Sequence, residues 1–382
     1  MLFLTARLRA RVLRALLAVA PGLIAAPAIA QDIAIGHVAP YTGPLTKDAN
    51  DTEMGAKVAI DAANDHGGVL GRKIRIITAD DHYKVEETAQ LISSMVGKVS
   101  ALLPMIGSAN IEYVMKQGIL DRVTLPVVGL FPSPDFVRNS PNRNLFHIRA
   151  GDRDQLNKII EQLTSVGITQ IGIIAPKTPF GASAAAVAEE LLEKQKLKLL
   201  ARGDVALGPK IDYEPALNAV SKKNLAAILL LTPPTLTGEF VKQLRSRGET
   251  ALLFAMSYSD AKLIVKVAGK PFAHGVAIAQ IMPNPANRSV PLVKAFRADW
   301  EKYAATKDEP SFFNIEGYVS ARLIVEAIRR SKDPSPEGVR RGLEMLRNYD
   351  LGGYIIDFAP GKHIGSQFVD LSVIGASGTL LY

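Results

Sequence analysis

Short apolar runs alternate with longer amphipathic segments along most of the chain after Asp32. Apolar runs of this length are typical of strands buried on both faces, and the segments between them are long enough for helices. Strands that alternate with helices predict parallel sheets covered by helices on both faces and joined by right-handed crossovers. The predicted strands are IAIGHVA, KIRIITA, SALLPMIG, LPVVGLF, LFHIRA, QIGIIAP, LKLLARG, AAILLLT, ALLFAM and GVAIAQI.

These strands form two sets of five, and each set spans roughly 120 residues, the usual size of one domain. We therefore predict an α/β fold of two Rossmann-like lobes, each built on a parallel sheet. No linker rich in Pro, Ser or Gly separates the sets. Extended segments near Arg149 and Gln280 carry the chain between the lobes instead, which predicts a multi-strand hinge.

The segments after the second set are shared between the two lobes. Their patterns predict helices at 291–303, 312–330 and 336–347, and strands at 354–358 and 368–374. The predicted division places 31–149 and 281–346 in lobe one, and 150–280 and 347–382 in lobe two.

A glycine-rich stretch raises the question of a nucleotide site. Gly67, Gly68 and Gly71 follow a helix predicted over Thr52–Asp65 and precede a strand. A phosphate-binding glycine loop has the opposite order, because the anion sits on the free N–H groups of a helix that follows the glycines. We interpret these glycines as a helix C-cap and a tight turn, where left-handed backbone angles cost glycine little.

The first thirty residues differ from the rest of the chain. They contain four arginines, then an uncharged run, then the tripeptide Ala28-Ile29-Ala30. This pattern predicts a signal peptide at 1–30, cleaved before Gln31, and therefore export to the periplasm. A membrane anchor is the alternative, which the short uncharged run with Pro21 and Pro27 disfavours.

Charge and cysteine content narrow the possible partners. The net charge of +8 falls to +4 when the four leader arginines are removed, since no acidic residue leaves with them. No basic stripe is present, so we expect no nucleic-acid partner. The absence of cysteine excludes disulfides and a lipid-attachment cysteine, and it predicts a soluble exported protein.

Catalytic motifs are missing from the sequence. It contains no G-x-S-x-G elbow, no H-E-x-x-H motif and no Walker loop, and its six histidines are scattered. We therefore predict that the protein is not an enzyme and has no cofactor or metal. Asp80 and Asp81 end a predicted strand on opposite faces, so we expect them to be structural, for instance capping the next helix, rather than an acid–base pair.

Binding clefts in parallel sheets lie beyond the carboxyl ends of the strands, so the loops there are the candidates for a site. Gly107-Ser108-Ala109-Asn110 follows the third predicted strand and opens a helix. Free N–H groups at such a helix start can seat a carboxylate. The alternative is a plain N-cap by Ser108, and the two roles can coexist.

Several stretches together resemble the periplasmic solute-binding proteins of branched-chain amino-acid ABC transporters, which have the type I two-lobe fold. The stretches occur in family order over nearly all of the chain after the leader. This resemblance implies a small solute held between the lobes, a cognate permease in the inner membrane and a monomer. The matching stretches are TGPL, GAKVAIDAANDHGGVLGRKIRIITADD, LPVV, FG at Phe180-Gly181 and EGYVSARLIVEAI.

The resemblance also implies which residues bind the ligand. Lobe one would supply most of the polar contacts, and lobe two would close over the ligand. By position, the loop that would seat the carboxylate is Gly107, Ser108, Ala109 and Asn110, and the second lobe-one loop is Leu130, Phe131 and Pro132. The aromatic lid of lobe two would be Phe180. Phe312 and Phe313 would add to the wall of the cleft.

The sequence departs from this family at the position that binds the ligand's ammonium group. Leucine-type binders have an acid there, whereas this chain has Ser257. A buried ammonium group without a counter-charge is costly, so the departure favours a carboxylic acid without an amino group at least as strongly as an amino acid. Asp260 and Asp48 are the alternative partners for an amine.

Two further points complete the expected site. Pro132 stands where the family offers a threonine hydroxyl. We expect Phe131, Phe180, Tyr258 and Phe312 to supply apolar walls, with about half of them being core residues instead.

A ligand-sensing module of the same fold that signals to a receptor or kinase is the alternative function. An α/β dehydrogenase is disfavoured because no glycine signature follows the first strand.

Overall fold

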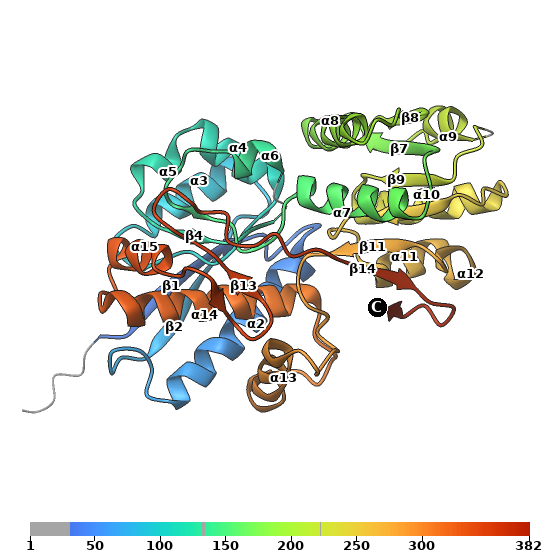
Figure 1. Cartoon of the computed structure of the whole chain (residues 1–382). Coiled ribbons are helices and arrows are strands. Elements are labelled where there is room, and N and C mark those ends of the chain that lie inside the picture. Colours follow the sequence, from blue (N-terminus) through green and yellow to red (C-terminus); the bar gives the residue numbers. More distant parts are fainter. Residues whose placement is uncertain (1–30, 132–133, 222) are drawn as a thin grey trace, which may run out of the picture. The chain divides into compact units, whose positions relative to one another are not determined.

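The computed structural model describes residues 31–131, 134–221 and 223–382, in which strands and helices alternate along the chain (Figure 1). The predicted signal peptide at 1–30 lies outside the described residues. Among the described residues, no helix has both the length and the apolar character needed to span a bilayer.

Lobe one is built on parallel strands. β1 pairs with β2 along its whole length, from Ile33 opposite Ile74 to Ala39 opposite Asp80. Leu102 forms parallel bridges to Gly36 of β1 and to Val127 of β4, so it lies between these two strands. The pairs β3–β5 and β4–β6 are also parallel. The strands of lobe one are β1 (Ile33–Ala39), β2 (Ile74–Asp80), β3 (Met105–Ile106), β4 (Val127–Val128), β5 (Leu130–Phe131) and β6 (Leu145–Phe146).

The helices of lobe one pack on both sides of these strands. α2 (Thr46–Asp65) and α14 (Phe312–Ser331) lie against each other although they are far apart in the sequence (Figure 1). Ile33, Phe146, Phe296 and Ile324 belong to the buried core on this side of the sheet. The other helices are α3 (Val85–Ser94), α4 (Ser108–Lys116), α5 (Ile119–Arg122), α6 (Asp135–Arg138), α13 (Pro291–Tyr303) and α15 (Pro336–Glu344).

Lobe two contains one seven-stranded sheet in the order β15-β14-β11-β10-β9-β7-β8. The pairs from β8 to β11 are parallel, whereas β14 and β15 join the edge in antiparallel orientation. Its strands are β7 (Ile171–Pro176), β8 (Ala201–Val205), β9 (Ala227–Leu230), β10 (Leu252–Ala255), β11 (Ala277–Gln280), β14 (Asp370–Ile374) and β15 (Leu380–Leu381). Its helices are α7 (Asp152–Ser165), α8 (Pro179–Lys194), α9 (Glu214–Val220), α10 (Pro234–Ser246), α11 (Ala261–Ala268) and α12 (Lys270–Ala273).

The chain passes between the lobes through three segments. One follows β6, the second follows β11 and the third precedes β14. The buried hydroxyl of Tyr354 donates to the carbonyl oxygen of Ile148 at 2.6 Å and lies 3.3 Å from that of Ile281, so it joins the first two segments. The predicted two-lobed α/β fold with a multi-strand hinge is confirmed.

The lobe boundaries remain a prediction. The packing of the residues after α15 bears on one of them, the boundary predicted at residue 347. The hairpin of β12 (Tyr349–Asp350) and β13 (Ile355–Ile356) follows α15. Leu351, Tyr354 and Phe358 share the core that contains Phe146. We therefore propose that the chain leaves lobe one after Phe358 rather than at residue 347.

Two expectations about the first helix have different outcomes. α2 begins at Thr46, six residues before the predicted start, so Asp48 is helical. The glycine turn after it is confirmed, because Gly67, Gly68 and Gly71 have φ values of 90°, 74° and 71°. The N–H of Gly68 donates to the carbonyl of Ala63 at 2.9 Å and closes the helix end.

Candidate functional site

The start of α4 presents free donors, as the sequence suggests. Gly107 precedes the helix with φ 102°, and a Cβ at this position would overlap the ring of Tyr83. Among the described residues, no backbone carbonyl accepts from the N–H groups of Ser108, Ala109 or Asn110. Such N–H groups at a helix start favour an anion. The expectation that Ser108 is the N-cap is wrong, because Gly107 occupies that position and the Ser108 side chain makes no capping hydrogen bond.

The side chain of Asn110 has a structural role inside lobe one. Its Nδ2 donates to Thr88 Oγ1 at 2.6 Å and lies 3.3 Å from Asp81 Oδ2. Asn110 is only 1% exposed, so this contact holds α4 against α3. The Nδ2 end of the amide is thus used inside lobe one, whereas Asn110 Oδ1 has no hydrogen-bond partner among the described residues.

The two aspartates at the end of β2 are also structural, as expected. Asp80 Oδ1 accepts from the backbone N–H of Tyr41 at 3.0 Å and of His82 at 2.9 Å. Asp81 accepts from the hydroxyl of Thr88 at 2.8 Å. The N-cap position of α3 is Lys84, whose side chain makes no capping hydrogen bond, so the capping role that the sequence suggested as an example for the aspartates is wrong.

The second lobe-one loop contributes an aromatic surface. Phe131 ends β5, is 7% exposed and meets Phe313 edge to face at 4.8 Å. Its carbonyl accepts from the N–H of Gly107 at 2.7 Å, so the two predicted loops are joined. Leu130 is buried in the lobe-one core, and Pro132 lies outside the described residues.

Arg149 lies at the centre of the polar contacts between these elements. Its guanidinium carbon is 4.8 Å from the ring centroid of Phe131. Nη1 pairs with the carboxylate of Glu316 on α14 at 3.2 Å, and Nη2 donates to Ser257 Oγ at 3.0 Å. Arg149 is 1% exposed and Glu316 is 3% exposed. The first crossing segment therefore brings a buried cation to both α14 and the loop after β10.

The region around Arg149 contains further buried polar groups. Burial raises the pKa of Glu316, while the positive charge of Arg149 opposes this shift. Burial also raises the pKa of Asp152 to about 6, again against the effect of Arg149. Arg149 Nε, Asp152 Oδ2 and the hydroxyl of Tyr258 have no hydrogen-bond partner among the described residues. Buried polar atoms normally have partners, so these three atoms can interact with a bound solute or water.

The lobe-two candidates surround the same position. Phe180, the second residue of α8, meets Tyr258 edge to face at 5.2 Å. The backbone N–H of Ser257 donates to Gln155 Oε1 at 2.9 Å. Asp260 is the N-cap of α11 and accepts from the N–H of Leu263 at 2.8 Å.

A cavity of about 290 Å³ is lined by candidates from both lobes. Ser257 and Asp260 come from the loop after β10, and Phe312 and Phe313 come from the start of α14. Asp48 lies in the first turn of α2, and its pKa is raised to about 7 by burial, with further contributions from Asp51 and Asp260, while Lys47 and Arg149 lower it. The described lining of the cavity presents aromatic rings, hydroxyl groups, the carboxyl group of Asp260 and the ammonium group of Lys47, and it does not include Asp48.

Comparison with known proteins identifies the family. The sequence model of the periplasmic binding protein family matches residues 32–376. The chain belongs to this family. A substrate-binding periplasmic protein from Ralstonia solanacearum is 31% identical, with a TM-score of 0.82 over 92% of this chain and 99% of that protein.

Other relatives agree with this assignment. An extracellular ligand-binding receptor from Verminephrobacter eiseniae is 30% identical, with a TM-score of 0.85 over 92% of this chain and 100% of that protein. The Leu/Ile/Val-binding protein homolog 7 of Brucella abortus is 23% identical over 340 residues, which cover 84% of this chain and 83% of that protein. The predicted resemblance to solute-binding proteins of branched-chain amino-acid transporters is confirmed. These relatives are solute-binding proteins and not enzymes. Membership of the family also implies a periplasmic location.

In this periplasmic binding protein, most of the predicted residues lie in one connected region. Ser257, Asp260 and Phe312 line one cavity, and Arg149 connects Ser257 to Phe131. Phe180 and Tyr258 pack in the same core cluster as Phe131. The side chains of Asn110 and Leu130 point into lobe-one contacts, and Ala109 is exposed. Their roles as ligand contacts remain a prediction.

The sequence analysis missed Arg149 and Glu316 as members of this region. Arg149 follows an apolar strand run and was expected only to mark the hinge. A cation at the end of an apolar strand and a glutamate on the apolar face of α14 are signals that favour a buried pair, because such residues are almost never buried unless paired.

Proposed function

We propose that this periplasmic binding protein captures a small carboxylate-bearing solute between its lobes and delivers it to the permease of an ABC transporter. The observation that carries the proposal is the hydrogen bond of Ser257 Oγ to Arg149 at 3.0 Å. The position at which relatives of the leucine type would hold an ammonium group is here a hydroxyl that faces a cation. A ligand next to it would therefore meet a hydroxyl group and a guanidinium group instead of a free carboxylate.

The lobe-one donors support a carboxylate in this place. The N–H groups of Ser108, Ala109 and Asn110 have no backbone acceptor among the described residues. A carboxylate on these groups would lie at a helix start, where the helix dipole stabilises negative charge. The rings of Phe131, Phe313 and Phe180 would contact the apolar part of an aromatic or aliphatic acid.

The acidic groups nearby are poor partners for an ammonium group. Glu316 is paired with Arg149, and Asp260 accepts the N–H of Leu263 as a helix cap. The pKa of Asp48 is about 7, so this carboxyl group is only partly ionised at neutral pH. We propose that acids without an amino group bind at least as tightly as branched-chain amino acids.

The leader and the permease complete the proposed pathway. We propose that the basic and apolar segment at 1–30 directs export and is cleaved before Gln31, so that a monomeric protein reaches the periplasm. Closure over the solute would create the form that the permease recognises, because a ligand shifts an equilibrium toward the state that it contacts best.

A thermal-shift and calorimetry screen tests the ligand class. The purified protein is titrated with leucine, isoleucine and valine and, separately, with aromatic and aliphatic monocarboxylic acids. A ligand at about 100 times its dissociation constant should add about 2.7 kcal/mol to the free energy of unfolding. Stabilisation by the amino acids alone would contradict the argument from Ser257.

A substitution at the proposed seat tests the location. Ser108→Trp should abolish binding of the best acid and keep the fold, because the residue is partly exposed at the start of α4. Ser94→Trp, at the end of α3, is the matched control and should keep the affinity. Equal affinities in the two variants would remove α4 from the site.

A further inference from the structure

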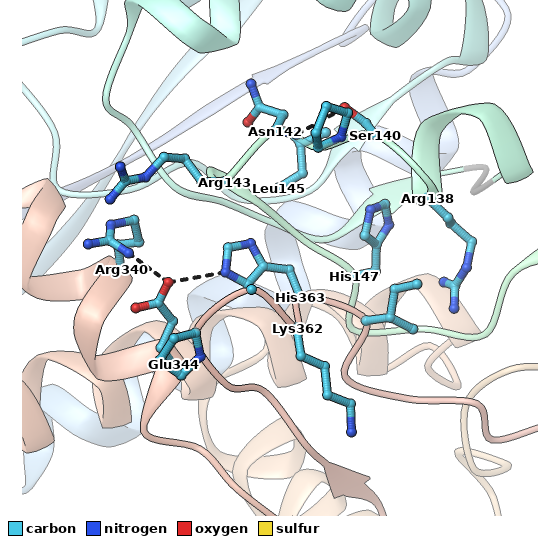
Figure 2. A pocket seen from close by; sticks show the side chains of 14 residues that line it. Arg138, Ser140, Asn142, Arg143, Leu145, His147, Arg340, Glu344, Lys362 and His363 are labelled. Carbon is cyan, nitrogen blue, oxygen red and sulfur yellow. Dashed lines mark hydrogen bonds and ion pairs between the residues drawn. The ribbon is translucent and has the colours of Figure 1, made fainter.

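A second cavity, of about 610 Å³, lies in lobe one and has a different chemistry. Its wall is formed by the segment from α6 to β6, by α15 and by the turn at 359–362. Figure 2 shows the side chains that surround it, with Arg143, Arg340, Lys362 and two histidines among those labelled. The predicted ligand residues at 107–110, 130–131, 180, 257–260 and 312 do not line this cavity.

The lining has an excess of positive charge. Arg138, Arg143, Arg340 and Lys362 are cationic, whereas Glu344 is the only acidic residue in the described lining. Arg138, Arg340 and Lys362 each have an acidic partner. Among the described residues, no carboxylate lies within ion-pair distance of Arg143. Glu337 forms ion pairs with Arg340 and Arg341, and its pKa is lowered by Arg340 and, more weakly, by Arg143. Arg143 therefore lies in the field of a carboxylate without an ion pair to it, and its guanidinium can donate to an anion.

A buried histidine adds a polar atom without a partner. His147 lines the cavity and is 2% exposed, and its Nδ1 has no hydrogen-bond partner among the described residues. A buried polar atom that stays unpaired destabilises the folded protein. A ligand oxygen in the cavity can provide the missing partner.

The other walls are held in place before any ligand binds. His363 stacks on Phe146 at 4.1 Å and contacts Glu344 at 3.2 Å, while Glu344 also accepts from Arg340 (Figure 2). The N–H of His147 donates to the carbonyl of His363 at 2.8 Å, which fixes the crossing segment beside β6. Arg138 is held by the carbonyl of Arg149 at 2.7 Å. Preformed walls reduce the entropy that binding must overcome.

We propose that this cavity, between α15 and the segment that ends in β6, binds a small anion with two or more negative charges on carboxylate or phosphate oxygens. The volume matches that of a metabolite-sized ligand, for which sites of about 300–1,000 Å³ are typical. Arg143 supplies the unpaired charge, and His147 supplies a buried hydrogen-bonding nitrogen. The site is separate from the proposed solute cleft, and it does not depend on the identity of the solute.

Isothermal titration calorimetry with inorganic phosphate and with citrate tests the proposal, at constant ionic strength set with sodium chloride. The unmodified protein should bind at least one of the two anions with saturable heat. Arg143→Gln removes the unpaired cation from an exposed position and should weaken binding roughly tenfold or more, because the anion loses a charge-assisted hydrogen bond. The comparison of phosphate with citrate distinguishes the two oxygen chemistries.

Two control variants distinguish binding in this cavity from a general effect of surface charge and from binding in the solute cleft. Arg75→Gln removes another exposed arginine, on β2, and should leave anion binding unchanged. Ser108→Trp should also leave it unchanged, whatever happens to binding in the solute cleft. The proposal is overturned if neither anion binds, if Arg143→Gln and Arg75→Gln have equal effects, or if Ser108→Trp abolishes anion binding while Arg143→Gln does not.

Discussion

Arg149 places a positive charge where water does not reach, and its partners come from distant parts of the chain. Its guanidinium contacts Glu316 on α14 and Ser257 after β10. A guanidinium remains protonated in proteins, so removal of the neighbouring carboxylate leaves a charge that cannot be neutralised. At the scale of single residues, we therefore expect the stability of the fold to depend on this pair.

The variant Glu316→Gln keeps the shape of the side chain and removes its charge. We expect it to lower the free energy of unfolding by about 3–5 kcal/mol, because it breaks a buried pair and leaves Arg149 unbalanced. Glu326→Gln is the matched control on the same helix, where the carboxylate pairs with the more exposed Arg329 and Arg330 and should cost at most about 1 kcal/mol. Urea denaturation of both variants measures the difference, and equal losses would contradict the assignment.

Asp152 predicts a pH dependence with a definite sign. Burial raises its pKa to about 6 in the folded protein. A carboxyl group with a raised folded pKa contributes stability below its unfolded pKa of about 4, and this contribution is lost as the pH rises through the folded value. Asp152→Asn removes the titration, so its stability relative to the unmodified protein should rise by up to about 3 kcal/mol between about pH 4 and pH 8.

Urea titrations at the two pH values provide the measurement for Asp152. Asp357→Asn is a useful control, because Lys362 lowers the pKa of Asp357, and its stability contribution is present at high pH and lost in acid. That loss occurs below the unfolded pKa of about 4, so the relative stability of Asp357→Asn should change little between pH 4 and pH 8. A pH-independent difference for Asp152→Asn would contradict the prediction.

At the scale of elements, two glycines explain how α2 and α14 approach each other. A Cβ at Gly55 would overlap the carbonyl oxygen of Asn314, and a Cβ at Gly317 would overlap that of Thr52. The two glycines belong to two separate stretches that carry the family resemblance. Each helix therefore has a glycine at the point where a backbone carbonyl of the other helix approaches it.

Gly55→Ala tests this close approach. We expect a net loss of about 1–3 kcal/mol in the free energy of unfolding from overpacking, although alanine favours a helix over glycine by about 1 kcal/mol. Asn50→Ala, on the exposed side of α2, is the control and should be neutral or slightly stabilising, as its helix propensity predicts. If Gly55→Ala raised the midpoint of urea denaturation as much as Asn50→Ala, the helices would not be in contact at these glycines.

The sequence was most informative for elements with a long and regular pattern. The predicted helix at 291–303 coincides with α13, and the strand runs of lobe two reappear as β7 to β11. Lobe one has shorter strands than predicted because Pro104 interrupts the third run and Gly129, with φ 105°, interrupts the fourth. The early start of α2 was missed because Leu45, its N-cap, gives no capping signal.

The candidate site could be predicted only in part, because some of its contacts join residues that are far apart in the sequence. The loop at Gly107 could be found because local order alone, a strand followed by a helix, marks a place for an anion. Arg149 could not be assigned a partner in this way, since Glu316 and Ser257 lie 167 and 108 residues away in the sequence. Contacts of this range depend on how the lobes are assembled rather than on local pattern.

At the scale of the whole molecule, Tyr354 connects the segments on which the hinge depends. Its hydroxyl donates to the carbonyl oxygen of Ile148 and lies 3.3 Å from that of Ile281. These two residues belong to two different segments that connect the lobes. The ring is 1% exposed and belongs to the lobe-one core. The hinge is thus stabilised by a side chain from the C-terminal part of the chain, and its rigidity should depend on that hydroxyl.

Tyr354→Phe removes the hydroxyl and keeps the ring. We expect the free energy of unfolding to fall by about 1–3 kcal/mol, because the buried carbonyl of Ile148 loses its donor and that of Ile281 loses a neighbouring polar group. Hydrogen exchange should become faster near Ile148 and Ile281, while the buried amides of β9 should keep their protection, since local opening is confined to the hinge. Tyr349→Phe, a half-buried tyrosine on the same C-terminal segment, is the control and should change neither quantity. Unchanged exchange at both crossings in Tyr354→Phe would mean that the hydroxyl does not hold the hinge and that its stiffness comes from backbone pairing alone.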